Sequence, residues 1–151
     1  HNSMQGRLMH WVTRRGIRVN RTATAWLVRR FIDPGATFEF VEPEAVAGVE
    51  WARGAAGFDA PGARYPHRDA RGRCSFTALV EERCPDDTAL RALARIIQSA
   101  DFPEELGLSP EAPGLRAISR GFPLVARDDQ DTLERAGFLY DALYASLREA
   151  L

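Results

Sequence analysis

The order of apolar and polar positions in the first half of the chain predicts strands alternating with helices. Residues 8–13 form a short apolar run, residues 36–42 alternate Phe38 and Phe40 with polar neighbours, and residues 55–62 form a third short strand ending in a turn. Helical stretches separate them at residues 20–33 and 43–52. A βαβαβ order implies a small parallel sheet.

The second half of the chain has helical periodicity throughout. Helices are predicted over residues 74–84 with Ser75 as a cap, from Asp86 or Asp87 onward, over residues 110–120, and from about Asp128 to the end. The last of these carries Leu133, Ala136, Tyr140, Leu143, Tyr144 and Leu147 on one face. The predicted fold class is therefore α/β, with a βαβαβ N-terminal half covered by a helical C-terminal half. We expect one domain over residues 8–151, with residues 1–7 a tag remnant and disordered N-terminus.

The predicted helix at residues 20–33 carries arginines but has almost no polar face. Asn20 is placed to cap its start, and Asp33-Pro34-Gly35 stops it. Apolar side chains surround its axis, which is typical of a buried helix. The head group of Arg21 or Arg29 should then lie in the interior or in a cleft, where it needs a carboxylate or an anionic ligand.

Composition narrows the class of protein. The net charge of −1 gives no bulk attraction to nucleic acid or to an anionic membrane, and all 20 basic residues are arginine. Two cysteines ten residues apart, Cys74 and Cys84, fit neither a disulfide framework nor a zinc ribbon. No apolar run has the length of a membrane span, and no signal peptide is visible. We expect a cytoplasmic domain.

Candidate chemistry gathers at the predicted ends of strands and helices. Arg21 follows the first strand, Asp59 ends the third, His67 lies in the loop after it, and Asp101 ends a helix. Ligands of parallel sheets bind beyond the carboxyl ends of the strands, so we expect these four to converge. The alternatives are a loop histidine bonded to backbone and a turn aspartate. Packing is the simpler role for three further side chains, Trp26, Cys74 and Tyr140.

Several motifs resemble one known family. "RTATAWLVRRFIDPGATFEFV", "GFDAPG", "RCSFTAL", "SAD" and "YDALYASL" occur in the order found in the chromate-resistance domain, the C-terminal domain of ChrB-type proteins, also called chromate resistance exported protein. The resemblance runs from about Trp11 to Leu147. The matching positions are Arg21, Trp26, Arg29, Arg30, Phe31, Phe58, Asp59, His67, Cys74 to Phe76, Ala100 and Asp101.

The resemblance implies a stress-response protein, a chromate-responsive regulator or accessory factor that acts beside a chromate efflux pump. Longer members carry an N-terminal region for DNA binding, so no direct nucleic-acid binding is expected of this domain alone. Thr24 and Ala25 stand where the family often has cysteine and proline, so a redox role for that cysteine does not carry over.

Three hypotheses follow. In the first, the domain binds or senses a small oxyanion such as chromate, sulfate or phosphate through Arg21, Arg29, Arg30 and His67. In the second, it is a metal-dependent enzyme acting on a small anionic substrate, with iron, manganese or zinc held by Asp59, His67 and Asp101. In the third, it is a structural or dimerisation domain, such as a homodimer, whose arginines satisfy internal carboxylates.

Overall fold

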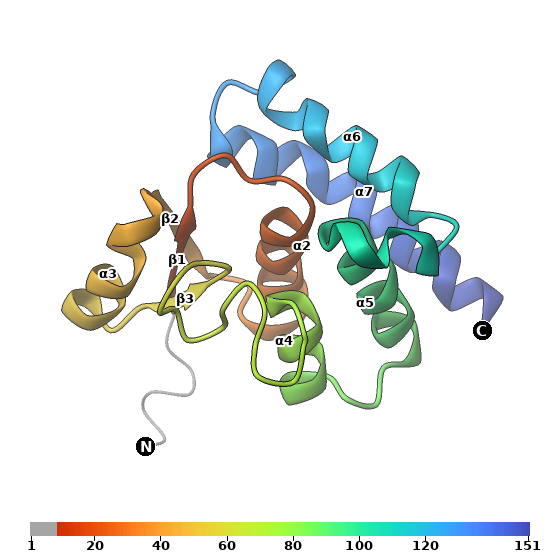
Figure 1. Ribbon diagram of the computed structural model, residues 1–151, viewed down its shortest axis with the longest axis horizontal. Coiled ribbons are helices and arrows are strands. Elements are labelled where there is room, and N and C mark those ends of the chain that lie inside the picture. The colour runs from red at the N-terminus through yellow and green to blue at the C-terminus, as the bar shows by residue number, and fades with distance from the viewer. Residues whose placement is uncertain (1–8) are drawn as a thin grey trace.

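A small parallel sheet forms one end of the molecule (Figure 1). The computed structural model describes residues 9–151, so the expectation for residues 1–7 lies outside the described residues. The strands are β1 (His10–Arg14), β2 (Thr37–Val41) and β3 (Ala56–Phe58), in the order β2-β1-β3. Trp11 is opposite Phe38 on one side and Ala56 on the other, and both pairings are parallel.

Helices make up most of the remaining described chain, and the predicted α/β class is confirmed. They are α2 (Val19–Leu27), continued by the π-helical turn η1 (Val28–Ile32), then η2 (Pro43–Ala45), α3 (Val46–Arg53), α4 (Ser75–Arg83), α5 (Thr88–Asp101), η3 (Pro103–Leu108), α6 (Ala112–Val125) and α7 (Asp129–Ala150). Figure 1 shows α3 on one side of the sheet and α2 on the other, with the helices of the second half beyond α2. No helix among residues 9–151 is long and apolar enough to cross a membrane.

Strand alternation divides the interior into two unequal cores. Trp11, Phe38 and Phe58 point to the main core, which the helices of both halves complete. Val12 points to the opposite face, where it packs with Val46 of α3 in a much smaller cluster. Neighbouring residues of a strand face opposite ways, so a single sheet supplies both cores.

Asn20 does not cap α2, contrary to the prediction. The helix begins at Val19, and Asn20 lies inside the first turn with its side chain buried. Its Nδ2 donates to Ser75 Oγ at 2.7 Å, and its Oδ1 accepts from the backbone N–H of Phe76 at 3.2 Å and from Thr24 Oγ1 at 3.3 Å. Ser75, the predicted cap of α4, instead accepts the hydrogen bond from Asn20. Cys74 occupies the N-cap position of α4, and its side chain makes no capping hydrogen bond.

The predicted stop at Asp33 and the predicted burial of this helix are both confirmed. The last turn widens, and the N–H of Asp33 donates to the carbonyl of Val28 at 2.7 Å, which is a π-type bond. The Asp33 carboxylate accepts from the N–H of Met9 at 2.6 Å and of Gly35 at 3.0 Å. This aspartate therefore ends the helix and ties its end to the residue that precedes β1.

The predicted starts of two C-terminal helices are confirmed by their caps. Asp87 accepts from the N–H of Leu90 at 2.8 Å, and Asp128 accepts from the N–H of Asp131 at 2.8 Å. α6 continues to Val125, beyond the predicted end at residue 120, with Pro123 inside its last turn. Glycine and proline normally signal a helix end, which is why the sequence pattern placed the boundary too early.

Candidate functional site

Asp59 is placed over the carboxyl end of the sheet by an unusual backbone conformation. It directly follows β3, has φ of +53°, and is 1% exposed. Aspartate tolerates this left-handed region better than most residues do. The N–H of Asp59 donates to the carbonyl of Tyr65 at 2.7 Å, which fixes the turn. Its carboxylate consequently points into the protein where β1 and β3 end.

Two guanidinium groups and the imidazole of His67 surround the Asp59 carboxylate. Arg21 Nη1 donates to Oδ2 at 3.0 Å, while Arg14 Nη2 at 3.2 Å and His67 Nδ1 at 2.7 Å both donate to Oδ1. Arg21 is 13% exposed, and its other arm donates to the carbonyl of Gly16 at 2.8 Å. The prediction that Arg21 or Arg29 meets a carboxylate is thereby confirmed.

The charges in this cluster shift the pKa of each partner. Burial alone would raise the pKa of Asp59, but the His67 hydrogen bond and the two guanidinium groups outweigh it and lower the pKa. The hydrogen bond to Asp59 is the largest cause that raises the pKa of His67. Burial lowers the pKa of Arg21 despite the attraction of Asp59. The geometry is thus that of an ionised carboxylate held by cations.

Asp101 lies beside this cluster in a very different environment. It ends α5, and its buried Oδ2 accepts no hydrogen bond from a described residue; the nearest cation, His67 Nδ1, is 3.6 Å away. Burial, and then the charge of Asp59, raise the pKa of Asp101 to about 6. Arg116 approaches, but it donates to the backbone carbonyl of Ala100 at 2.8 Å. No arginine among residues 9–151 therefore donates to the Asp101 carboxylate.

The predicted convergence of Arg21, Asp59, His67 and Asp101 is confirmed as geometry. One ligand atom from each of Asp59, His67 and Asp101 lies within 4.8 Å of the others, which is close enough for shared coordination of a metal ion. However, both oxygens of Asp59 already accept from guanidinium groups. A divalent cation would have to displace these arginines and would be repelled by them.

A cleft of about 420 Å³ opens next to this cluster. Its charged lining consists of Arg15, Arg18, Arg21, Arg116, Arg120, Asp59 and Asp101. The cleft lies beyond the carboxyl ends of β1 and β3 and at the start of α2. In a sheet of this order, β1 and β3 flank the point where the connections reverse direction, the usual ligand position in open α/β folds. Five arginines and two aspartates line it, so its lining carries a net positive charge.

Four of these cleft arginines were not singled out by the sequence reasoning. Arg15 and Arg18 had a usable signal, since four arginines occur in the eight residues from Arg14 to Arg21, directly after the first strand. Arg116 and Arg120 are four residues apart on α6 and share one helix face, but nothing in the sequence connects that face to the sheet.

Two other predicted ligand-binding residues lie elsewhere. Arg29 packs over the Phe38 ring, with its Cζ atom 5.1 Å from the ring centroid, and donates to Glu134 of α7 at 3.4 Å. Arg30 donates to Asp141 of α7 at 3.2 Å. Neither contacts a member of the Asp59 cluster. At about 100° per helix position, Arg30 lies on the side of the helix opposite Arg21, and Arg29 lies about 80° away from it.

The environments of Trp26, Tyr140 and Cys74 fit the packing role that the sequence suggested for them. Trp26 Nε1 donates to Asp141 at 2.8 Å, and the Tyr140 hydroxyl donates to the carbonyl of Val19 at 3.1 Å. Cys74 is buried, and burial raises the pKa of its thiol to about 12. A thiol with that pKa is almost entirely protonated at neutral pH, which makes it a poor nucleophile.

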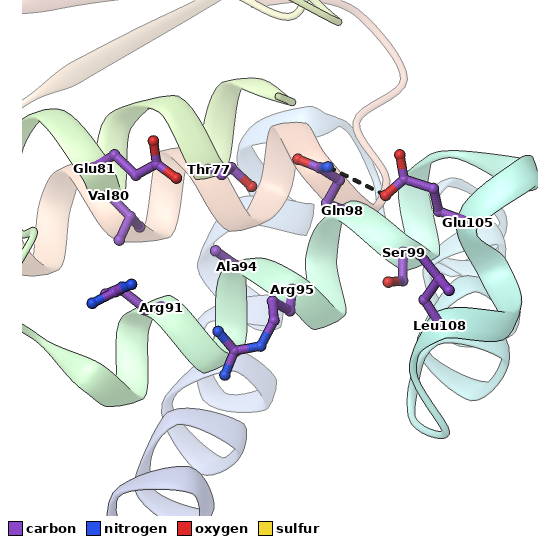
Figure 2. Close-up of a pocket in the computed structure, with 10 residues that line it drawn as sticks. All are labelled: Thr77, Val80, Glu81, Arg91, Ala94, Arg95, Gln98, Ser99, Glu105 and Leu108. Atoms are coloured by element: carbon purple, nitrogen blue, oxygen red, sulfur yellow. Dashed lines mark hydrogen bonds between the residues drawn. The ribbon is translucent and has the colours of Figure 1, made fainter. Parts of the chain in front are cut away.

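A second cavity, of about 220 Å³, lies between α4, α5 and η3. Figure 2 shows Arg91 and Arg95 on its α5 side and the hydrogen bond between Gln98 and Glu105, 3.2 Å long. Its arginines are balanced by Glu81 and Glu105, and it does not adjoin the ends of the strands. Charge and position therefore favour the larger cleft as the site.

Comparisons with known proteins identify relatives of this chain. The family model described as "ChrB, C-terminal domain" matches residues 11–147. A protein from Cupriavidus metallidurans, called "Protein ChrB", is 36% identical over 143 residues, which cover 93% of this chain and 40% of the relative. The chain thus spans less than half the length of that relative. No solved structure matches.

Proposed function

This chain belongs to the ChrB C-terminal domain family, and on that premise we propose that it is a chromate-resistance domain that binds a small oxyanion in the arginine-lined cleft. Chromate is the ligand that the family resemblance suggests. The binding surface differs from the set expected from the sequence: Arg21 remains, while Arg29 and Arg30 are replaced by the other arginines of the cleft.

The observation that carries this proposal is the excess of guanidinium groups over carboxylates in one cleft. Asp59 is already held by Arg14, Arg21 and His67, so it offers little further repulsion to an anion. Arg18 and Arg120 form no hydrogen bond or ion pair through their side chains within residues 9–151. Guanidinium groups bind oxyanions through paired N–H donors, and the free N–H groups at the start of α2 add to the attraction.

His67 contributes indirectly in this proposal. It does not line the cleft, and its Nδ1 donates to Asp59. By sharing Asp59 with Arg21, it fixes the carboxylate that orients the arginine. We therefore assign His67 a positioning role.

The metal-dependent enzyme remains a second candidate because of one observation, the close grouping of Asp59, His67 and Asp101. These residues would hold iron, manganese or zinc, and the cleft would hold the anionic substrate. The two arginines that donate to Asp59 argue against this candidate, because their charge would repel a metal ion. Elemental analysis of the purified protein separates the candidates, since a stoichiometric metal would favour the enzyme and contradict the simpler binding domain.

The oxyanion proposal is tested by removing the two unpaired arginines of the cleft. Chromate binding is measured by isothermal titration at low ionic strength for the wild type and for the Arg18→Gln, Arg120→Gln double variant. A hydrogen bond to a charged group contributes about 1.5–3 kcal/mol, so losing two should weaken binding at least about 100-fold. Both side chains are exposed, so the fold should be preserved.

The matched control is the Arg91→Gln, Arg95→Gln double variant in the cavity of Figure 2. It removes the same charge from another pair of exposed arginines. Equal weakening in both double variants would mean that only net charge matters, and unchanged binding in the first would remove the cleft from consideration.

A further inference from the structure

Asp101 is the one cleft carboxylate that no described donor satisfies. Within residues 9–151, neither of its side-chain oxygens accepts a hydrogen bond, and Oδ2 is fully buried. The side chain is 17% exposed and Asp101 lines the cleft, so Oδ1, which is not fully buried, is the oxygen that a ligand in the cleft can reach. A ligand that displaces water from this oxygen leaves it without a hydrogen bond unless the ligand itself carries the donor.

The groups around Asp101 cannot provide this donor. His67 Nδ1 donates to Asp59, Arg21 donates to Asp59 and Gly16, and Arg116 donates to the backbone carbonyl of Ala100. Arg14 donates to Asp59 as well. These N–H groups are therefore engaged elsewhere, and the buried Nε of Arg21, which has no hydrogen-bond partner among residues 9–151, makes no bond to Asp101.

We propose that Asp101 makes the cleft selective for oxyanions that retain a proton, such as hydrogen phosphate, hydrogen arsenate and hydrogen chromate, over sulfate. This inference rests on the proposed function, because it concerns the same cleft. A protonated oxyanion donates its O–H to the carboxylate while its other oxygens accept from the arginines. Sulfate has the same shape but only acceptor oxygens, so its oxygen would meet the carboxylate oxygen with no hydrogen between them.

A hydrogen bond from the ligand to Asp101 distinguishes anions that have the same shape and charge. A site built around one hydrogen bond rejects an analogue that lacks it, because the buried protein group is then left unpaired. Chromate takes up a proton much closer to neutral pH than sulfate does. The same carboxylate would therefore admit chromate, as hydrogen chromate, and reject sulfate.

The test compares phosphate with sulfate at mildly alkaline pH, where both are dianions and only phosphate carries a proton. Isothermal titration of the wild type should give at least about a tenfold preference for phosphate. Arsenate and selenate form a second pair with the same difference. Methyl phosphate, a dianion without the proton, should bind like sulfate, which separates free oxyanions from phosphate esters.

The decisive variant is Asp101→Asn, which keeps the shape of the side chain and adds an N–H donor. Removing the negative charge should strengthen binding of every anion, so the readout is the ratio of the two affinities. We expect the phosphate-to-sulfate ratio to fall to within about threefold. Asp141→Asn on α7, outside the cleft, removes the same charge and should leave the ratio unchanged.

Equal wild-type affinities for phosphate and sulfate would overturn the selectivity while leaving oxyanion binding intact. An unchanged ratio in Asp101→Asn would show that this carboxylate acts only through its charge, and would overturn it too. If no oxyanion binds the wild type at all, the proposed function itself fails.

Discussion

At the scale of single residues, two neighbouring carboxylates have opposite electrostatic environments. Asp59 accepts hydrogen bonds from two arginines and a histidine, which lower its pKa. Asp101 is buried without a donor, and burial raises its pKa to about 6. The same side chain is thus stabilised as an anion in one place and destabilised in the other.

The unpaired Asp101 should cost the free protein stability at neutral pH. Its folded pKa lies above the ordinary value of 3.8, so the folded state binds the proton more tightly, and stability falls as pH rises from 3.8 to about 6. A shift of this size corresponds to at most about 3 kcal/mol. The free energy of unfolding, measured in urea, should therefore be about 1–3 kcal/mol higher for Asp101→Asn than for the wild type at neutral pH. This difference should shrink in acid.

Asp59→Asn is the matched comparison and should act in the opposite direction. Because the folded pKa of Asp59 is lowered, its contribution is present above the ordinary value of 3.8 and disappears as pH falls through the folded pKa. Its removal leaves the buried Arg21 unpaired, at a cost of about 3–5 kcal/mol at neutral pH. A destabilised Asp101→Asn protein at neutral pH would contradict this account of the pair.

Sequence reasoning identified the cluster around Asp59 but not the other arginines that line the cleft. Arg21, Asp59 and Asp101 were recognisable because they stand at ends of predicted strands or helices, and His67 because it lies in the loop after the third strand, where parallel sheets bind ligands. The cleft arginines on α6 were not, because an exposed arginine on a helix has the same local pattern whether it faces a ligand or only water. Their role depends on how α6 packs, which is information from distant parts of the chain.

At the scale of elements, a buried polar contact joins α2 to α4. Asn20 donates to Ser75, accepts from the N–H of Phe76, and is almost inaccessible to solvent. This contact fixes the rotation of α2 about its own axis as well as its position, because hydrogen bonds are directional while apolar packing is not. This rotation determines that Arg21 faces the cleft.

Asn20→Ala should destabilise the protein by about 2–4 kcal/mol, because the N–H of Phe76 and the hydroxyl of Ser75 lose buried partners. Chemical unfolding followed by circular dichroism measures the change. Gln130→Ala is the control: this amide donates to the carbonyl of Phe38 from an exposed position, so its loss should cost under about 1 kcal/mol. Equal effects of the two substitutions would contradict the assignment of Asn20 to the interior.

The boundaries of elements were predicted less well than their existence. Asn20 near a helix start has the same local sequence whether it caps the helix or is buried in its first turn, and only the position of Ser75 decides between them. By contrast, the helix starts at Asp86 or Asp87 and near Asp128 were predicted correctly, since the capping bonds of Asp87 and Asp128 reach only three residues along the chain. Local interactions can be read from sequence, whereas contacts across the fold cannot.

At the scale of the whole molecule, the last helix holds the loop that borders the cleft. The Asp129 carboxylate, in the first turn of α7, accepts from the N–H groups of Gly16 at 3.0 Å and Ile17 at 2.9 Å. This loop connects β1 to α2 and includes Arg15 and Arg18. The position of two cleft arginines therefore depends on residues more than a hundred positions away.

Asp129→Ala should loosen this loop without unfolding the protein. We expect faster hydrogen exchange at the amides of Gly16 and Ile17, and chromate binding weakened by about tenfold because the loop must be ordered on binding. Asp128→Ala serves as the control, since it removes the cap of the same helix and touches no loop amide. Similar exchange at both amides in the two variants would contradict a specific role for Asp129.

The cleft also couples ligand binding to folding. Its lining comes from the β1–α2 loop, the end of β3, the end of α5 and one face of α6, so it exists only when all of these are assembled. A ligand that binds there has no site on the unfolded chain. By mass action, an oxyanion at about a hundred times its Kd would add about 2.7 kcal/mol to the free energy of unfolding. If the proposed function holds, the melting temperature of the domain should therefore rise with oxyanion concentration.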